Sequence, residues 1–313
     1  LGQGERVTIL GRGPAPDWVA FRGTYIDSSG PVPALPSQDL VISTFWTTIE
    51  PAFSLGLGPV AHFCQGYEGS HSHYLEQRSQ IEAAYERPGA ALTVTPYLGE
   101  LLRTKFGKPS RVVPPTRDPR FRPRPRRRPR RRPWVAVPGV FRAAVKGVPT
   151  ALEAIAILRR RGIECRVLRF STEPLTDDER AVLDPDRYLA GVHPEVVARE
   201  LRDCDLLLLP SQPEEGFGLP LLEAMASKVP AIASKIPSTV FMADGAVPLM
   251  PVGDAGAFAR AALELLTDHG AWRRARRSGY RAVGRFEPET VAVALAEAVR
   301  WAASATKGEA SGA

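Results

Sequence analysis

Short apolar runs alternate with amphipathic stretches along most of this chain. In the first half, the runs Val60–Cys64 and Ala91–Val94 predict two strands. Between and after them, His73–Arg87 and Pro96–Phe106 carry apolar residues at helical spacing, and Gly107 is a good helix end. Repeated alternation of strand and helix predicts a parallel sheet that helices cover on both faces.

The alternation continues in the second half and is clearer there. Trp134–Phe141 and the fully apolar run of Asp205–Leu209 predict buried strands. Pro194–Asp203 and Ala255–Asp268 predict helices, and Glu289–Ala303 predicts a last amphipathic helix. The second half therefore predicts a further parallel α/β unit.

The net charge of +7 comes from one stretch of the chain. Residues Arg117–Arg132 hold ten arginines and one aspartate, which is +9, so the rest of the chain sums to about −2. Four prolines in the same stretch forbid a regular helix, and like charges favour an extended chain. The pattern predicts a solvated linker over residues 116–133, between two domains.

The three cysteines predict neither a disulfide framework nor a zinc site. Cys64, Cys165 and Cys204 lie far apart in apolar runs, without a C-x-x-C pair or a neighbouring pair of histidines. Three small core thiols are typical of a reducing compartment, which favours a cytoplasmic protein. No stretch approaches the roughly 18 apolar residues that a membrane span requires.

The richest segment for chemistry is Pro210–Ala233, with the sequence PSQPEEGFGLPLLEAMASKVPAIA. It predicts a buried strand, a loop and a helix, and ligands bind where such strands end because free backbone amides face them. Gly216 and Gly218 allow a ligand to approach the backbone closely. Glu215 and Glu223 are acceptors suited to sugar hydroxyls, although both could instead serve only to complement the helix dipole.

A second segment, Val135–Gly147, also runs from a strand into a small-residue loop. It presents Arg142 and Lys146 four residues apart, where each could donate charge-assisted hydrogen bonds to a pyrophosphate. Taken alone, the two cations are better interpreted as solvated surface residues.

Together these segments resemble glycosyltransferase family 4 of the GT-B superfamily, nearest to bacterial rhamnosyltransferase-like members. In that family an Arg and a Lys-Gly follow one strand, then come Pro-Ser, Glu-Gly-Phe-Gly-Leu-Pro and Glu-Ala-Met-Ala. Seven residues separate the two glutamates, as they separate Glu215 and Glu223 here. The matching residues occur in this order: Arg142, Lys146-Gly147, Pro210-Ser211, Glu215–Pro220 and Glu223–Ala226.

The resemblance implies a donor site for a nucleotide diphosphate sugar. Arg142 and Lys146 would hold the phosphates, Glu215 the hydroxyls of the transferred sugar, and Glu223 those of the ribose. Transfer would retain the anomeric configuration, with Glu215, Arg142 and Lys146 as catalytic residues and with neither a metal ion nor a cofactor. The implied donor-binding residues are Gly139, Arg142, Lys146, Ser211, Glu215, Gly216, Phe217, Gly218, Leu219 and Glu223.

The first half resembles the family less closely. Many relatives place a histidine at the end of the strand that corresponds to Val60–Cys64, whereas this chain has Gln65 there. Gln65, Tyr67 and Glu68 are therefore the acceptor-side candidates. The chain's own histidines in this region are interpreted as structural or surface residues; they are His62, His71 and His73.

The resemblance implies two doubly wound Rossmann-like domains that face a cleft. The first ten residues look like the end of a helix and a second strand, so we expect the first strand and helix of the N-terminal domain to be missing. The expected organisation is an N-terminal acceptor-side domain, a linker, a donor-binding domain, a C-terminal helix on the N-terminal domain, and a disordered tail. Their ranges are residues 1–115, 116–133, 134–286, 287–304 and 305–313.

These observations predict a retaining glycosyltransferase that acts on a glycan or lipid-linked acceptor in cell-surface polysaccharide synthesis. The alternative is a catalytically inactive GT-B-derived protein that binds nucleic acid or anionic surfaces through its arginines. For Arg117–Arg132, three interpretations stay open: a solvated linker, a contact with an anionic membrane from the cytoplasmic side, or a nucleic-acid contact. Few aromatic residues interleave these arginines, which disfavours nucleic acid.

Overall fold

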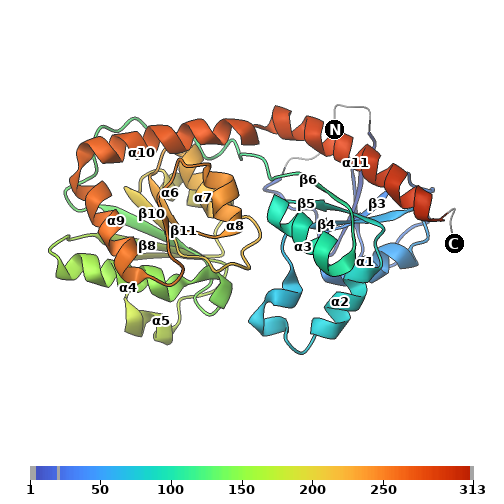
Figure 1. Ribbon diagram of the computed structural model, residues 1–313, viewed down its shortest axis with the longest axis horizontal. Helices are drawn as coiled ribbons and strands as arrows, with labels where there is room; N and C mark the ends of the chain where they lie inside the picture. Colours follow the sequence, from blue (N-terminus) through green and yellow to red (C-terminus); the bar gives the residue numbers. More distant parts are fainter. Residues whose placement is uncertain (1–4, 20–21, 311–313) are drawn as a thin grey trace.

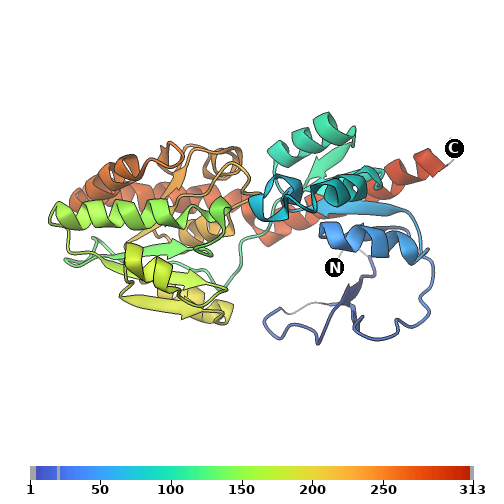
Figure 2. The ribbon, with the colours of Figure 1, turned by 90° about the horizontal axis from the view of Figure 1, so that it is seen from below.

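The computed structural model describes residues 5–19 and 22–310. Figure 1 shows two α/β domains side by side, connected by a linker and by long helices near the end of the chain. The same two bodies are distinct when the molecule is seen from below (Figure 2). Each domain has its own parallel sheet, as the sequence predicts.

The N-terminal domain is built on four parallel strands in the order β3-β4-β5-β6. Its helices are α1, α2 and α3, and α3 ends at Gly107 with a φ of +65°. The helix predicted from residue 73 begins later, at Arg78, because two short 3-10 turns precede it. The element bounds are β3 (Val41–Ser43), α1 (Trp46–Ser54), β4 (Val60–Cys64), α2 (Arg78–Glu86), β5 (Ala90–Thr93), α3 (Pro96–Phe106) and β6 (Ser110–Val112).

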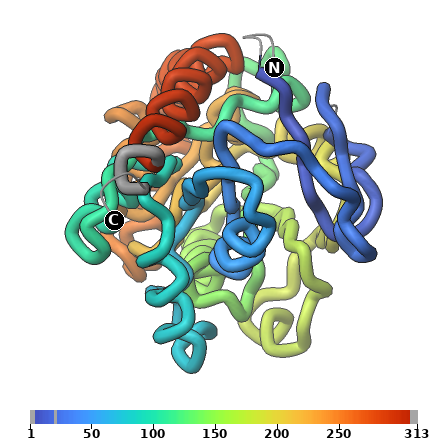
Figure 3. The backbone as a smooth tube through the Cα atoms, turned by 90° about the vertical axis from the view of Figure 1, so that its right-hand side faces the viewer, coloured from blue at the N-terminus to red at the C-terminus, as the bar shows by residue number. Residues whose placement is uncertain are grey.

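The segment before this sheet differs from its predicted form. The strand expected near the start of the chain is present as β1 (Thr8–Gly11), but it pairs only with β2 (Thr24–Asp27) in a separate two-stranded parallel sheet. Figure 3 shows this segment, in dark blue, on one side of the N-terminal domain. The first four residues, where the end of a helix was expected, lie outside the described residues.

The C-terminal domain has six parallel strands in the order β12-β11-β10-β7-β8-β9. The chain starts in the middle of the sheet at β7, builds outward to β9, then returns to β10 and builds to the other edge. This reversal makes a crevice between β7 and β10 at their carboxyl ends, where ligands bind in such sheets. The strands are β7 (Trp134–Pro138), β8 (Arg166–Ser171), β9 (Arg187–Ala190), β10 (Leu206–Leu209), β11 (Ala231–Ser234) and β12 (Leu249–Met250).

Helices cover both faces of this sheet, so the domain is doubly wound. One buried cluster joins α4 and α9 to alternate residues of β7 and β10, and a second joins α6, α7 and α8 to the opposite face. Because both faces of the sheet are buried, Leu206–Leu209 is apolar at every position. The helices are α4 (Val148–Arg160), α5 (Asp177–Val182), α6 (Pro194–Leu201), α7 (Leu219–Ala226), α8 (Pro237–Ala243), α9 (Ala255–Thr267) and α10 (His269–Ala282).

The arginine-rich linker is docked on the protein, and its prediction as a solvated segment is wrong in this respect. Phe121 is buried, and Arg126 and Arg130 bond to the carboxylate of Asp205 at the start of β10. That carboxylate is fully buried and also accepts from the backbone amides of Arg130 at 3.0 Å and Trp134 at 2.9 Å. A buried charge is tolerated only when paired in this way, so the linker has a fixed path.

The chain ends in α11 (Pro288–Ala310), which crosses from the C-terminal domain and packs on β4 and β5 (Figure 1). Ala298 and Ala302 are buried against the N-terminal domain. The disordered tail predicted from residue 305 is wrong for residues 305–310, which continue the helix. The last three residues of that predicted tail lie outside the described residues.

Candidate functional site

Two loops that leave the carboxyl ends of neighbouring strands are joined into one site. The loop after β7 and the loop after β10 share a backbone hydrogen bond, from Gln212 N to Val145 O at 2.8 Å. Gly147, with a φ of +59°, lies against the carbonyl of Pro210, and a Cβ there would come within 2.0 Å of that oxygen. Glycine is therefore required at this position, and its close approach brings Lys146 next to the second loop.

Lys146 and Glu215 form the centre of the site. The Lys146 Nζ lies 2.8 Å and 3.1 Å from the two carboxylate oxygens of Glu215, and the Ser211 hydroxyl donates to the same carboxylate at 3.1 Å. The Glu215 side chain is only 10% exposed, whereas that of Lys146 is 35% exposed. The site thus presents an accessible ammonium group over a shielded carboxylate, so an anion and a polyhydroxyl group could bind side by side.

A buried arginine fixes the first loop, and the sequence analysis missed it. Arg169 on β8 is fully buried, pairs with Glu179 at 2.5 Å, and donates to the carbonyls of Val137 at 2.5 Å and Gly139 at 2.8 Å. These bonds hold the point where the chain leaves β7. The signal in the sequence was an arginine within the otherwise apolar run of this strand, which requires a partner when buried.

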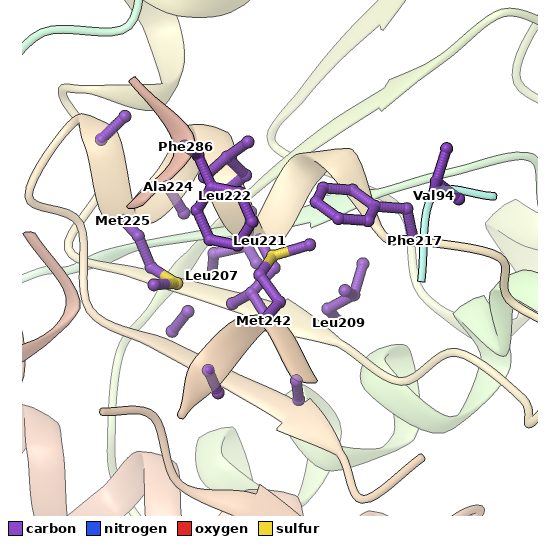
Figure 4. Packing of buried hydrophobic residues seen from close by; sticks show 14 of the residues in the cluster. Val94, Leu207, Leu209, Phe217, Leu221, Leu222, Ala224, Met225, Met242 and Phe286 are labelled. Atoms are coloured by element: carbon purple, nitrogen blue, oxygen red, sulfur yellow. The ribbon is translucent and has the colours of Figure 1, made fainter. Parts of the chain in front are cut away.

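The loop after β10 turns into α7 through Gly218, the N-cap residue, with a φ of +87°. Glycine adopts this backbone conformation more readily than other residues do. The first backbone amides of α7 have no partner within the helix, so they are available to a ligand at the site. Phe217 points the other way and is 5% exposed. Figure 4 shows its ring between Val94 of the N-terminal domain and the cluster that contains Phe286.

The same loop, residues 210–218, contacts the N-terminal domain; it is called the donor loop after the ligand that the sequence predicts for it. A Cβ on Gly216 would lie 2.0 Å from the carbonyl oxygen of Gln65 and 3.1 Å from Gly66 Cα. The Thr95 hydroxyl at the start of α3 donates to the Gly216 carbonyl at 3.3 Å. Of the predicted acceptor-side residues, Gln65 is therefore beside the donor loop.

The structure does not bring Arg142 and Glu223 into the central cluster. Arg142 is exposed and pairs with Asp178 at 3.2 Å, an exposed pair that contributes little stability. Glu223 lies on α7 toward the linker. Burial raises the pKa of Glu223 to about 7, the charge of Asp118 adds to this rise, and Arg120 opposes it.

Tyr67 and Glu68, the other acceptor-side candidates, are buried within the N-terminal domain. The Tyr67 hydroxyl donates to Glu82 at 3.3 Å, and the Tyr85 hydroxyl donates to Glu68 at 2.6 Å. Burial raises the pKa of Glu68, and the bond from Tyr85 opposes this. Their side chains stabilise the loop after β4, and their assignment to the acceptor side stays a prediction.

His71, which the sequence analysis interprets as a structural or surface residue, lies close to the candidate site. Burial lowers the pKa of His71, and His73 adds to this, whereas the carbonyl of Glu214 and the charge of Glu215 act in the opposite direction. The ring therefore lies near the donor loop. Its Nε2 is buried without a hydrogen-bond partner among the described residues. Its position in the loop that follows the carboxyl end of β4 was the available signal.

Comparison with known proteins finds a family match for most of the C-terminal domain. Residues 132–268, from the start of β7 through α9, match the family described as "Glycosyl transferases group 1". A phosphatidyl-myo-inositol mannosyltransferase from Mycobacterium leprae is 30% identical over 152 residues. The match covers 47% of this chain and 41% of the mannosyltransferase, so less than half of that relative is represented.

Solved structures extend the likeness to both domains. A sucrose-phosphate synthase from Thermosynechococcus elongatus aligns with a TM-score of 0.72 and 18% identity over 95% of this chain and 89% of the synthase. HepE from Anabaena, in complex with UDP-glucose, aligns with a TM-score of 0.68 and 14% identity over 83% of this chain and 78% of HepE. The fold is that of the GT-B glycosyltransferases, with two parallel α/β domains. None of the helices in residues 5–19 and 22–310 is both long and apolar enough to cross a membrane.

Proposed function

We propose that this protein transfers a sugar from a nucleotide diphosphate donor to a glycan or lipid-linked acceptor, with retention of anomeric configuration. The observation that carries the proposal is the Lys146–Glu215 pair beside the start of α7, at the contact between the two domains. An ammonium group, a shielded carboxylate and open backbone amides supply the complementary groups that a sugar diphosphate requires.

In the proposed complex the donor replaces the ion pair of the free protein. The diphosphate takes Lys146 and the amides of Phe217, Gly218 and Leu219, while sugar hydroxyls take Glu215. Arg142 leaves its exposed pair with Asp178, which costs little, and joins the phosphates. Both charges of the central pair are thereby satisfied again, so donor binding leaves no buried charge unpaired.

Catalysis in this proposal is electrostatic. The bond between the sugar's anomeric carbon and the phosphate oxygen breaks, and Lys146, Arg142 and the N-terminus of α7 stabilise the negative charge on the departing nucleotide diphosphate. The acceptor hydroxyl attacks the anomeric carbon from the same face and gives its proton to the departing phosphate oxygen. No bound metal is required, so chelation with EDTA should leave transfer unchanged. Gln65 and His71, which reach the donor loop from the N-terminal domain, are the residues we assign to the acceptor side.

The sugar and its acceptor belong to the same proposal at a finer level. The resemblance to rhamnosyltransferase-like proteins favours a hexose or deoxyhexose donor and a role in cell-surface polysaccharide synthesis in the bacterial cytoplasm. Thermal unfolding with UDP, GDP and dTDP would identify the base, because a ligand that binds only the folded protein raises its Tm.

The test of the catalytic assignment is transfer from the stabilising nucleotide sugar by Glu215→Gln and Lys146→Ala. We expect each variant to lose about 100-fold or more in kcat, the usual effect of removing one group that stabilises a transition state. Glu153→Gln, which changes an exposed glutamate on α4, is the matched control and should retain full activity.

Turnover within about threefold of wild type by Glu215→Gln would refute the assigned roles. If no nucleotide stabilises the wild-type protein, the alternative of a catalytically inactive binding protein replaces the proposal. Circular dichroism of each variant distinguishes loss of chemistry from loss of fold.

A further inference from the structure

The structure divides the arginines of the linker into two groups. One group has acidic partners: Arg117, Arg120, Arg124, Arg126, Arg130 and Arg132. Arg120 pairs with Asp118 of the linker itself, and the other five pair with acidic residues outside it. The other group is exposed, and within the described residues none of its members has an acidic partner within 4.0 Å. It comprises Arg122, Arg127, Arg128 and Arg131.

Helix α10 adds a second row of cations beside the linker. Arg273, Arg277 and Arg281 are exposed and follow one another at helical spacing, and none has an acidic partner within 4.0 Å among residues 5–19 and 22–310. Two bonds fix α10 to the linker, from Arg276 to the carbonyl of Arg124 at 2.8 Å and from Arg273 to that of Arg127 at 3.4 Å. The two rows therefore form one surface.

This surface lies at the end of the sheet opposite the loops that follow β7 and β10. The linker bonds to Asp205 and Trp134, which stand at the amino ends of β10 and β7. Ser211 and Gly139 follow the carboxyl ends of the same two strands. Each strand separates the two ends by about 3.3 Å per residue, so a partner bound to the arginines would leave the donor site open.

We propose that these seven arginines, here called the arginine face, bind the headgroups of anionic phospholipids at a membrane surface. The arginine face consists of Arg122, Arg127, Arg128, Arg131, Arg273, Arg277 and Arg281. Among the described residues its charges have no acidic partner within 4.0 Å, so the guanidinium groups are available to a layer of phosphate groups. Binding of phospholipids by the arginine face does not depend on the sugar transfer proposed above.

The aromatic rings of Phe121 and Trp272, beneath the arginine face, are covered and offer no stacking surface to the bases of a nucleic acid. Phe121 is buried, and Trp272 is fully buried beneath Arg276, whose guanidinium lies 4.5 Å from the ring centroid. Proteins that bind single strands use exposed aromatic rings for this purpose. The arginine face therefore offers charge alone, which matches a lipid surface better than an unpaired strand.

The experiment is co-sedimentation with vesicles of phosphatidylglycerol and phosphatidylcholine, compared with vesicles of phosphatidylcholine alone. We expect salt-sensitive binding only to the anionic vesicles. Arg127→Gln with Arg128→Gln should weaken this binding about 30-fold, since each basic residue contributes about fivefold. Arg273→Gln with Arg277→Gln should have a similar effect, because α10 supplies three of the seven arginines.

The matched control is Arg12→Gln with Arg260→Gln, which removes the same charge from exposed arginines elsewhere. Equal loss of binding in this control, or equal binding to neutral vesicles, would overturn the proposal. The proposal would also be overturned if duplex DNA displaced the protein from the vesicles at a phosphate concentration below that of the lipid. Nucleotide-induced thermal shifts should be the same in all three double variants, which keeps this test separate from that of the donor site.

Discussion

Glu223 is the residue of the proposed donor site whose ionisation the fold perturbs most. Its carboxyl has an ordinary pKa of 4.5 and a pKa of about 7 in the folded protein. The folded state thus binds the proton more tightly than the unfolded state. Folding loses stability as the pH rises from about 4.5 to about 7, by an amount on the order of 3 kcal/mol.

Glu223→Gln should remove this dependence. We expect the variant to have a higher Tm than wild type at pH 8 and nearly the same Tm at pH 4.5, because glutamine has no proton to lose. Urea unfolding at several pH values would measure the difference. Equal pH dependence of the two proteins would show that Glu223 is not the titrating group. If Glu223 binds the ribose, the variant will also bind the nucleotide more weakly.

Lys146, Ser211 and Glu215, which the structure brings together, could be selected from the sequence because they follow the ends of two buried strands. The interval between Glu215 and Glu223, with glycines after the strand, depends only on one loop and the first turns of one helix. Arg169 and His71 could not be found in this way. Their roles depend on which distant backbone atoms or charges the tertiary structure brings to them.

At the scale of elements, the linker is held by one carboxylate. Asp205 accepts bonds from two arginine side chains and two backbone amides while remaining fully buried. Removing one partner from such a buried network leaves other charges unpaired and costs about 3–5 kcal/mol.

Asp205→Ala should therefore lower the Tm by about 10 °C. It should also expose the linker's arginines to trypsin, whereas the wild-type linker should resist cleavage at Arg126 and Arg130. Asp177→Ala, at an exposed position on α5, is the control and should change neither property. A loss of less than about 1 kcal/mol in Asp205→Ala would mean that the carboxylate does not fix the linker.

Elements with clear periodicity and capping residues were predictable, and those with conflicting signals were not. The prediction of a strand over Val60–Cys64 and a helix over Pro96–Phe106 is confirmed residue by residue. Helix α1 escaped prediction because it contains Pro51, which normally excludes a helix interior. The docking of the linker could not be predicted either, because its composition does not indicate that it will bind Asp205, about 75 residues away.

At the scale of the whole molecule, the domains touch through the donor loop itself. Gly216 has an ordinary backbone conformation, so alanine would be tolerated in the isolated C-terminal domain. In the arrangement seen here its Cβ would collide with the carbonyl of Gln65. This position therefore tests the approach of the two domains.

We expect Gly216→Ala to lower kcat by about tenfold or more while the Kd for the nucleotide stays close to that of wild type. Small-angle scattering should show a larger radius of gyration for the variant. The control is Gly30→Ala, where a Cβ meets no atom within 4 Å. Normal turnover in Gly216→Ala would show that transfer does not require this contact.

The chain crosses between the domains twice, and the two crossings are tied together. The Arg117 amide donates to the Phe286 carbonyl at 2.6 Å, and its guanidinium pairs with Glu287 at 2.7 Å. Two connections joined at one place resist separation there and leave rotation about that place easier, so we expect this edge to act as a hinge between the domains. Phe286 also meets the ring of Phe217 at 5.8 Å. The donor loop therefore contacts the segment where the two crossings meet. A small displacement of this loop would change the angle between the domains and so move their far ends by a larger distance.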